Sequence, residues 1–92
     1  MAQITWSRQA NTDLVQIAEY IRRDSIQYAK AVVSGIVRAV ERLEQFPEMG
    51  RVVPELSDKN IREIIVPPYR IIYRLSRTQC EIIGVIHSRQ DI

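Results

Sequence analysis

The sequence predicts an α+β fold of order β-α-α-β-β-β, in which a helical hairpin packs on an antiparallel sheet. Two adjacent stretches with apolar residues at helical spacing predict the hairpin. Three β-rich runs with short connections follow them and predict an antiparallel meander. Because the apolar stripes of the helices need burial, we expect the hairpin to cover one face of the sheet. The other face is then left for solvent or a partner.

The N-terminal segment predicts a short strand followed by a helix. Residues 3–6 alternate polar and apolar side chains, which is typical of a strand. Ser7 stands where a helix N-cap belongs. Apolar residues then recur in steps of three and four, at Ala10, Leu14, Ile17, Ala18 and Ile21. The polar residues 22–24 end this helix.

A second helix follows after only a few residues. Ser25 can cap it, and its apolar positions again have helical spacing: Ala29, Val32, Val33, Ile36, Val40 and Leu43. It ends near Phe46, because Pro47 disfavours helical conformation in the residue before it. The short break between the two helices predicts an antiparallel hairpin.

The rest of the chain predicts a loop and three strands. Residues 47–60 are rich in Pro, Gly, Ser, Asp and Asn, which is typical of a loop. The strands are expected at residues 61–66, 69–76 and 80–87, with breaks at Pro67-Pro68 and at residues 77–79.

Length and composition limit the class of protein. The 92 residues predict a single domain, residues 1–92, and 46% hydrophobic residues suffice for a core without metal or disulfide. Cys80 is the single cysteine, which fits a small core residue in a reducing, cytoplasmic protein. No signal peptide and no membrane span are expected. The sequence has no glycine-rich phosphate loop and no metal-spaced His/Cys set, so we expect no cofactor and no metal.

Arginine dominates the basic residues and concentrates near the C-terminus. Eleven of the thirteen basic residues are arginine, which favours bidentate contacts with phosphate or carboxylate. Residues 61–92 carry five basic and three acidic residues, whereas residues 1–60 carry eight of each. The net charge of +2 therefore arises within residues 61–92, which include the three predicted C-terminal strands. These strands carry either a binding surface for an anion or a solvated, arginine-rich face.

Strand periodicity sorts these arginines by face. Arg70 and Arg74 share one face of the strand 69–76, and we expect that face to be open because burying an unpaired arginine costs several kcal/mol. Arg62 either joins them or pairs across strands with Glu63 or Glu81. Arg70 is the strongest functional candidate, because two tyrosines flank it and no acidic residue lies close in sequence.

His87 and Arg89 are two residues apart at the end of the last predicted strand, so strand alternation places them on the same face. Histidine is the usual general acid–base residue, but a lone histidine at a strand end is more often structural, so both roles stay open for His87. The remaining aromatic candidates, Trp6, Tyr20 and Tyr28, are expected to pack in the core.

Several segments in a fixed order resemble a known superfamily. They are residues 4–7 (Ile-Thr-Trp-Ser) with Ala10 and Asp13-Leu14, 17–21 (Ile-Ala-Glu-Tyr-Ile), 46–51 (Phe-Pro-Glu-Met-Gly-Arg), 54–56 (Pro-Glu-Leu), 61–63 (Ile-Arg-Glu), 69–74 (Tyr-Arg-Ile-Ile-Tyr-Arg) and 85–89 (Val-Ile-His-Ser-Arg). Over nearly its whole length the chain resembles the RelE/ParE superfamily of toxins from type II toxin–antitoxin systems. The superfamily has the element order predicted above.

This resemblance implies one of two activities. RelE-like members cleave messenger RNA on the ribosome without metal, and basic side chains stabilise the transition state. ParE-like members inhibit DNA gyrase and are not known as nucleases. RelE-type sites typically place lysines on the strand before the Tyr-Arg motif, where this chain has Ile61, Arg62 and Glu63, and no tyrosine follows Tyr73. Residues 47–51 also look more like the ParE branch.

The resemblance therefore implies a ParE-like inhibitor of DNA gyrase, active in growth inhibition and plasmid stabilisation. Its cognate antitoxin is expected to lay a segment across the sheet and the hairpin, in a toxin–antitoxin hetero-oligomer. The expected partner- or phosphate-binding residues are Arg62, Arg70, Arg74 and Arg89. No catalytic residue is assigned, and the sequence favours a protein that is not an enzyme. The alternative is a metal-independent, ribosome-dependent mRNA endonuclease of the RelE type, with the ribosome and mRNA as partners and Arg70 and His87 as catalytic residues.

Overall fold

The predicted helical hairpin is present in the computed structural model, which describes residues 1–90. Helix α1 spans Arg8–Arg22 and helix α2 spans Ile26–Glu41. Each begins at the predicted serine cap, because the hydroxyls of Ser7 and Ser25 accept backbone N–H groups three residues further on. A short 3₁₀ turn, η1 (Arg42–Glu44), follows α2 and carries the helical segment almost to its predicted end.

The sheet has five strands in the order β1-β5-β4-β3-β2. Their bounds are Gln3–Trp6 for β1, Arg51–Val52 for β2, Ile61–Val66 for β3, Tyr69–Leu75 for β4 and Gln79–His87 for β5. The predicted meander is confirmed, since β3, β4 and β5 pair antiparallel in succession.

Two features of the sheet differ from the prediction. Strand β1 pairs parallel with β5, so the sheet is mixed rather than wholly antiparallel. The pairing is available because the whole hairpin and meander separate the two strands in sequence, which is ample chain for a parallel arrangement. Within the predicted loop 47–60, β2 adds an antiparallel edge strand beside β3.

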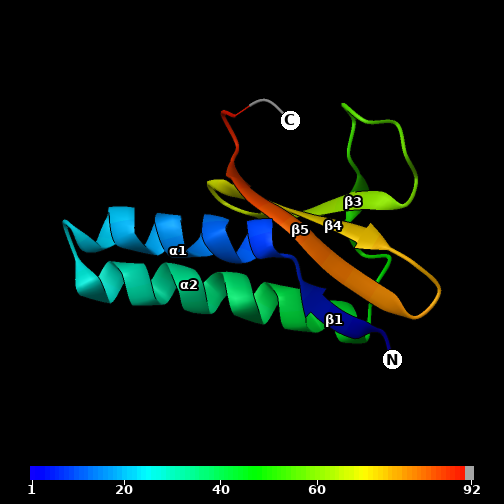
Figure 1. The fold of residues 1–92 in the computed structure, drawn as a ribbon, viewed down its shortest axis with the longest axis horizontal. Coiled ribbons are helices and arrows are strands. Elements are labelled where there is room, and N and C mark those ends of the chain that lie inside the picture. The colour runs from blue at the N-terminus through cyan, green and yellow to red at the C-terminus, as the bar shows by residue number, and fades with distance from the viewer. Residues whose placement is uncertain (91–92) are drawn as a thin grey trace.

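The main core lies between the hairpin and one face of the sheet, as predicted (Figure 1). Its largest fully buried side chains include Tyr73, Ile36, Leu43 and Ile82. Cys80 is fully buried in this core, and burial raises the pKa of its thiol, so it acts as a small apolar residue there.

The opposite face of the sheet is partly covered by the chain itself. Val53, just after β2, packs with Ile61 and Ile72 in a second apolar cluster, and the half-buried Ile83 lies against it. Ile83 stands at a register shift between β4 and β5. Beyond the shift, the Val85 N–H donates to the Asp13 carboxylate of α1 at 2.9 Å, which ties the hairpin to the sheet.

The hairpin reaches well past the sheet at the end where α1 passes into α2 (Figure 1). The two tyrosines near this end are 70% exposed (Tyr20) and 58% exposed (Tyr28). Their predicted core packing is therefore wrong, because the sheet does not extend far enough to cover them. Trp6 is half-buried against the core, as expected. Among the described residues, no helix is both long and apolar enough to cross a membrane.

Candidate functional site

Arg70 is the centre of a chain of ion pairs on the sheet face opposite the helices. Its Nε donates to Glu63 at 2.6 Å, and its two terminal nitrogens donate to both carboxylate oxygens of Glu55 at 2.8 and 2.9 Å. The Nε of Arg51 donates to the other oxygen of Glu63. Charges therefore alternate along the chain Arg51–Glu63–Arg70–Glu55.

Strand register explains why these four side chains meet. Glu63 lies opposite Ile72, and Arg70 lies opposite Ile65, so the two charged residues are diagonal neighbours on the same face. Arg51 lies directly opposite Glu63 across the β2–β3 pair. Glu55 lies two residues after Val53, in the segment that follows β2 and folds over this face.

The predicted exposure of Arg70 is wrong. The residue lies on the predicted face, but it is only 7% exposed and has two acidic partners. Glu63 and Glu55 are seven and fifteen residues away from Arg70 in sequence, so closeness along the chain does not reveal either partner. The tight turn at Pro67-Pro68 fixes the register that places Glu63 beside Arg70, and that signal was available from the sequence.

Both members of the Arg70–Glu55 pair are stabilised in their charged forms. The hydrogen bonds from Arg70 lower the pKa of the Glu55 carboxyl from 4.5 to about 2. The hydrogen bonds to Glu55, and next those to Glu63, raise the pKa of Arg70 further above its ordinary value. The bidentate edge of the guanidinium is therefore occupied by Glu55.

Arg62 lies on the other face of the sheet. It is opposite Tyr73, on the helix-facing side of β3, so it neither joins Arg70 nor pairs with Glu63 or Glu81. Its Nη1 donates to the backbone carbonyls of Glu48 and Gly50 at 3.3 and 3.0 Å. Its Nε is buried and has no hydrogen-bond partner.

Arg74 and Arg89 are the exposed members of the predicted set. Arg74 shares the face of Arg70 and pairs with Glu81 on β5 at 3.2 Å, with 56% of its side chain exposed. Such a surface pair contributes less than about 1 kcal/mol. Arg89 is exposed in the turn after β5 and makes no ion pair with an acid among residues 1–90.

His87 and Arg70 are not brought together. His87 lies opposite Tyr69, the neighbour of Arg70 in β4, so the two residues are on opposite faces of the sheet. The His87 ring meets the Tyr69 ring edge-on at 5.9 Å between centroids, and its Nδ1 accepts the Arg89 N–H. Together with Asp13 and other residues of α1, it lines a hollow of about 520 Å³.

Tyr73 organises the segment between η1 and β2, a role that no sequence pattern indicates. Its buried hydroxyl donates to the Pro47 carbonyl at 2.7 Å and accepts the Gly50 N–H at 3.1 Å. Burial raises the pKa of this phenol. Gly50 is required there, because a Cβ would lie 2.6 Å from both the Glu63 carbonyl and the Tyr73 hydroxyl.

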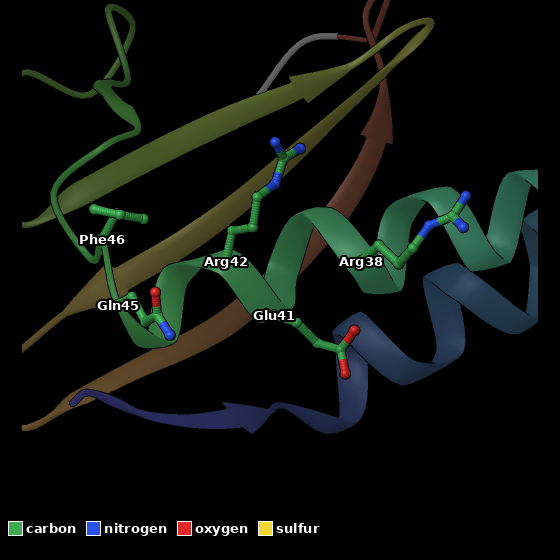
Figure 2. Close-up of a pocket in the computed structure, with 5 residues that line it drawn as sticks. All are labelled: Arg38, Glu41, Arg42, Gln45 and Phe46. Carbon is green, nitrogen blue, oxygen red and sulfur yellow. The ribbon is translucent and has the colours of Figure 1, made fainter.

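A basic hollow at the C-terminal end of α2 was also missed. It has a volume of about 510 Å³ and is lined by Arg38, Glu41, Arg42, Gln45 and Phe46 (Figure 2). Arg42 points towards the sheet, whereas Glu41 points away from it. Neither arginine forms an ion pair with an acid of the described chain. A scan for charges one helical turn apart would have found them.

The arrangement separates the candidate residues instead of concentrating them. Arg70 supports the sheet, Arg62 and His87 lie on its helix-facing side, and Arg74 is exposed on the far face. No group of three His, Cys, Asp or Glu residues within the described part of the chain could hold a metal ion. The geometry offers charged surfaces for binding, and it keeps the Arg70 and His87 side chains on opposite faces of the sheet.

Solved structures define the class to which this fold belongs. The structure titled "Chromosomal ParDE TA system from P. aeruginosa" matches with a TM-score of 0.78 at 23% identity, over 95% of this chain and 96% of that one. The structure of the YoeB dimer from Staphylococcus aureus matches with a TM-score of 0.60 at 16% identity, over 90% and 92% of the two chains. The chain therefore has the fold of these two structures, an α+β fold with two helices packed on a five-stranded mixed sheet.

Sequence comparison then identifies the family. The model described as "ParE toxin of type II toxin-antitoxin system, parDE" matches residues 4–92, so the chain belongs to this family. "Toxin RelE2" of Caulobacter vibrioides is 33% identical over 89 residues, covering 96% of this chain and 97% of that protein. "Putative toxin Y4kP" of Sinorhizobium fredii is 37% identical over 91 residues, covering 97% and 91%. The predicted resemblance is confirmed, and membership of a toxin–antitoxin module implies an antitoxin partner.

Proposed function

We propose that this toxin is a ParE-like inhibitor of DNA gyrase, held inactive by its cognate antitoxin. The observation that carries the proposal is the closed ion-pair chain around Arg70. An arginine that stabilises a phosphorane-like transition state needs free donors pointing at the reacting phosphate. Here Glu55 occupies the bidentate edge of Arg70, and Glu63 occupies its Nε. We therefore assign Arg70 to the support of the sheet and assign inhibition to exposed surfaces.

The exposed arginines are the proposed gyrase contacts. Arg74 is held only by the surface pair with Glu81, and Arg89 has no acidic partner among residues 1–90, so a partner can engage either one at little cost. Charged residues at the rim of an interface mainly raise the association rate, and they do so most at low salt. This is the behaviour we expect of these two residues.

The second candidate is a ribosome-dependent mRNA endonuclease. The relative named "Toxin RelE2", 33% identical, favours it. The separation of His87 from Arg70 argues against it, because general acid–base and charge-stabilising groups act on the same phosphate. A nuclease would need Glu55 to leave Arg70 and a different acid–base residue on that face.

A supercoiling assay with purified gyrase tests the proposal. We expect the toxin to inhibit supercoiling, and prior addition of the antitoxin to abolish the inhibition. We expect Arg74→Ala to raise the toxin concentration needed for half inhibition by about threefold. The matched control is Arg8→Ala, an exposed arginine at the start of α1 with no ion pair among the described residues. Full supercoiling in a molar excess of toxin, together with codon-phased cuts in mRNA on translating ribosomes, would select the endonuclease instead.

A further inference from the structure

The hollow of about 520 Å³ beside His87 lies between α1 and the end of β5. Helix α1 lines one side of it, and the ends of β4 and β5 line the other. It opens where β1 has ended, because β1 pairs with β5 only as far as Ile82. Its volume is typical of pockets that hold small organic ligands.

Three aromatic rings from three different elements line this hollow. Tyr20 comes from α1, Tyr69 from the start of β4 and His87 from the end of β5. The Tyr69 and His87 rings meet edge-on, with 81° between their planes. Burial raises the pKa of Tyr69, and the neighbouring phenols of Tyr28 and Tyr20 raise it further, so these hydroxyls lie near one another. Tyr20 is 70% exposed, so its ring can gain contacts with a flat ligand.

The polar groups of the hollow are oriented by the backbone of β5. The Asp13 carboxylate accepts the Val85 N–H at 2.9 Å. The Oε1 of Gln90 accepts the His87 N–H at 2.7 Å, which leaves both N–H groups of this amide as donors. Each carboxylate oxygen of Asp13 has a further lone pair. The hollow therefore offers both acceptors and donors in fixed positions.

The same contacts close the outer edge of β5 to an added strand. The N–H groups of Val85 and His87 already have side-chain acceptors. An extended peptide would have to displace Asp13 and Gln90 before it could pair with this edge. The hollow therefore suits a small, flat ligand better than a peptide strand.

The charges around the hollow favour an anionic ligand over a cationic one. The Arg23 guanidinium lies over the Tyr20 ring, 6.0 Å from its centroid. Arg89 is exposed in the turn after β5 and pairs with no acid among residues 1–90. Asp13 is the one acidic residue of the described chain that lines the hollow, and both of its oxygens already accept hydrogen bonds.

We propose that this hollow is a binding site for a purine nucleotide. The base stacks on the Tyr20 ring. Its edge forms hydrogen bonds with Asp13 and the Gln90 amide, and its phosphate reaches Arg89. The nucleotide is either free or part of a single-stranded nucleic acid, because stacking on an aromatic ring serves both. The proposal goes beyond gyrase inhibition and does not depend on it, since the ligand binds the toxin alone.

Proton NMR of the purified toxin tests the proposal. His87 is the single histidine of the chain, so its two ring C–H signals can be followed without overlap. The toxin is titrated with AMP, GMP and UMP at constant pH. We expect saturable shifts of the His87 signals with both purine nucleotides, because a base stacked in the hollow adds its ring current. We expect UMP to bind at least about threefold more weakly, because a smaller base stacks less strongly.

Two exposed tyrosines of the helical hairpin provide matched variants. Tyr20→Leu removes the stacking ring, whereas Tyr28→Leu changes a similar tyrosine that lines a different hollow. We expect Tyr20→Leu to weaken AMP binding by about tenfold and Tyr28→Leu to leave it within about twofold of wild type. Both side chains are more than half exposed, so both variants should fold, and thermal unfolding verifies this.

Two comparisons identify the phosphate contact and the source of the nucleotide. Arg89→Ala should weaken AMP binding by about threefold and leave adenosine binding unchanged, because adenosine has no phosphate. A single-stranded oligonucleotide of six adenosines is compared with AMP. Binding at least about tenfold tighter than AMP, and lost in Tyr20→Leu, would support the site with a nucleic-acid strand as its ligand. Equal affinities would support it with a free nucleotide.

Several results would overturn the proposal. One is the absence of any shift of the His87 signals at about 5 mM AMP or GMP. Another is a set of shifts that stays unchanged in Tyr20→Leu, because the base would then not stack in the hollow. Inorganic phosphate that reproduces the shifts at the same concentration would reduce the site to an anion contact at Arg89. UMP bound as tightly as AMP would exclude the recognition of a purine.

Discussion

Glu63 is the residue on which the buried charges of the sheet depend. Its side chain is fully buried, and it accepts hydrogen bonds from both Arg51 and Arg70. A buried carboxylate is tolerated only where donors of this kind replace its hydration. Removing one partner of such a buried ion pair destabilises the protein more than replacing both, because the remaining charge is left without compensation.

We predict that Glu63→Ala lowers the free energy of unfolding by about 3 kcal/mol, since Arg70 would keep only Glu55. Arg70→Ala should be similarly damaging, because it leaves Glu63 with Arg51 alone. The double variant Glu63→Leu/Arg70→Leu should cost clearly less than the sum of the single changes. Urea unfolding measures all three, with Arg74→Ala as the exposed control. Additive losses in the double variant would contradict the coupling.

At this scale the sequence predicted positions better than environments. Strand parity placed Arg70 and Arg74 on the correct face, because side-chain direction alternates locally. It could not reveal the Arg70–Glu55 pair, because Glu55 reaches Arg70 only after a two-residue strand and a loop have folded over the sheet. Arg62 was left undecided for the same reason, since its partners are loop carbonyls.

Two glycines show how differently the elements use the same residue. Gly35 lies inside α2 with open space around it, where glycine only lowers helix stability. Gly50 lies where the chain leaves η1 for β2, against the Glu63 carbonyl and the Tyr73 hydroxyl. One position tolerates a larger side chain and the other excludes even a methyl group.

Alanine substitutions at these glycines should therefore have opposite signs. We predict that Gly35→Ala raises the free energy of unfolding by up to about 1 kcal/mol through helix propensity. Gly50→Ala should lower it by about 2 kcal/mol or more, because the new Cβ forces the backbone away from Tyr73. Thermal unfolding of the two variants beside wild type measures both effects. A destabilised Gly35→Ala, or a neutral Gly50→Ala, would show that these surroundings are wrongly assigned.

The element order was predictable because most elements carry their own periodicity or caps. The two serine caps and the apolar stripes located α1 and α2, and the β-rich runs located β3, β4 and β5. Strand β2 has only two residues and therefore no period to detect. The parallel pairing of β1 with β5 depends on where the hairpin returns the chain, which no local pattern records.

On the scale of the whole molecule, the far face of the sheet carries an exposed arginine and a region covered by the chain itself. The side chain of Arg74 is 56% exposed on this face. The segment after β2 lies over that far face, held by Val53 in the second apolar cluster and by Glu55 on Arg70. Part of the attachment of this segment therefore depends on the charge of one carboxylate, that of Glu55.

That dependence predicts how stability changes with pH. Hydrogen bonds from Arg70 lower the pKa of Glu55 from 4.5 to about 2, so the folded state binds its proton less readily than the unfolded state. The contribution of Glu55 to stability is full above about pH 4.5 and is lost as the pH falls through about 2.

Glu55→Gln mimics the protonated carboxyl and should be less stable than wild type at pH 7. The two proteins should converge as the pH falls from 4.5 towards 2. Urea unfolding of both proteins across this pH range isolates the contribution of Glu55 to stability, because every other acidic residue titrates in both proteins. A stability difference that stays constant down to pH 2 would show that Arg70 does not hold Glu55 in solution.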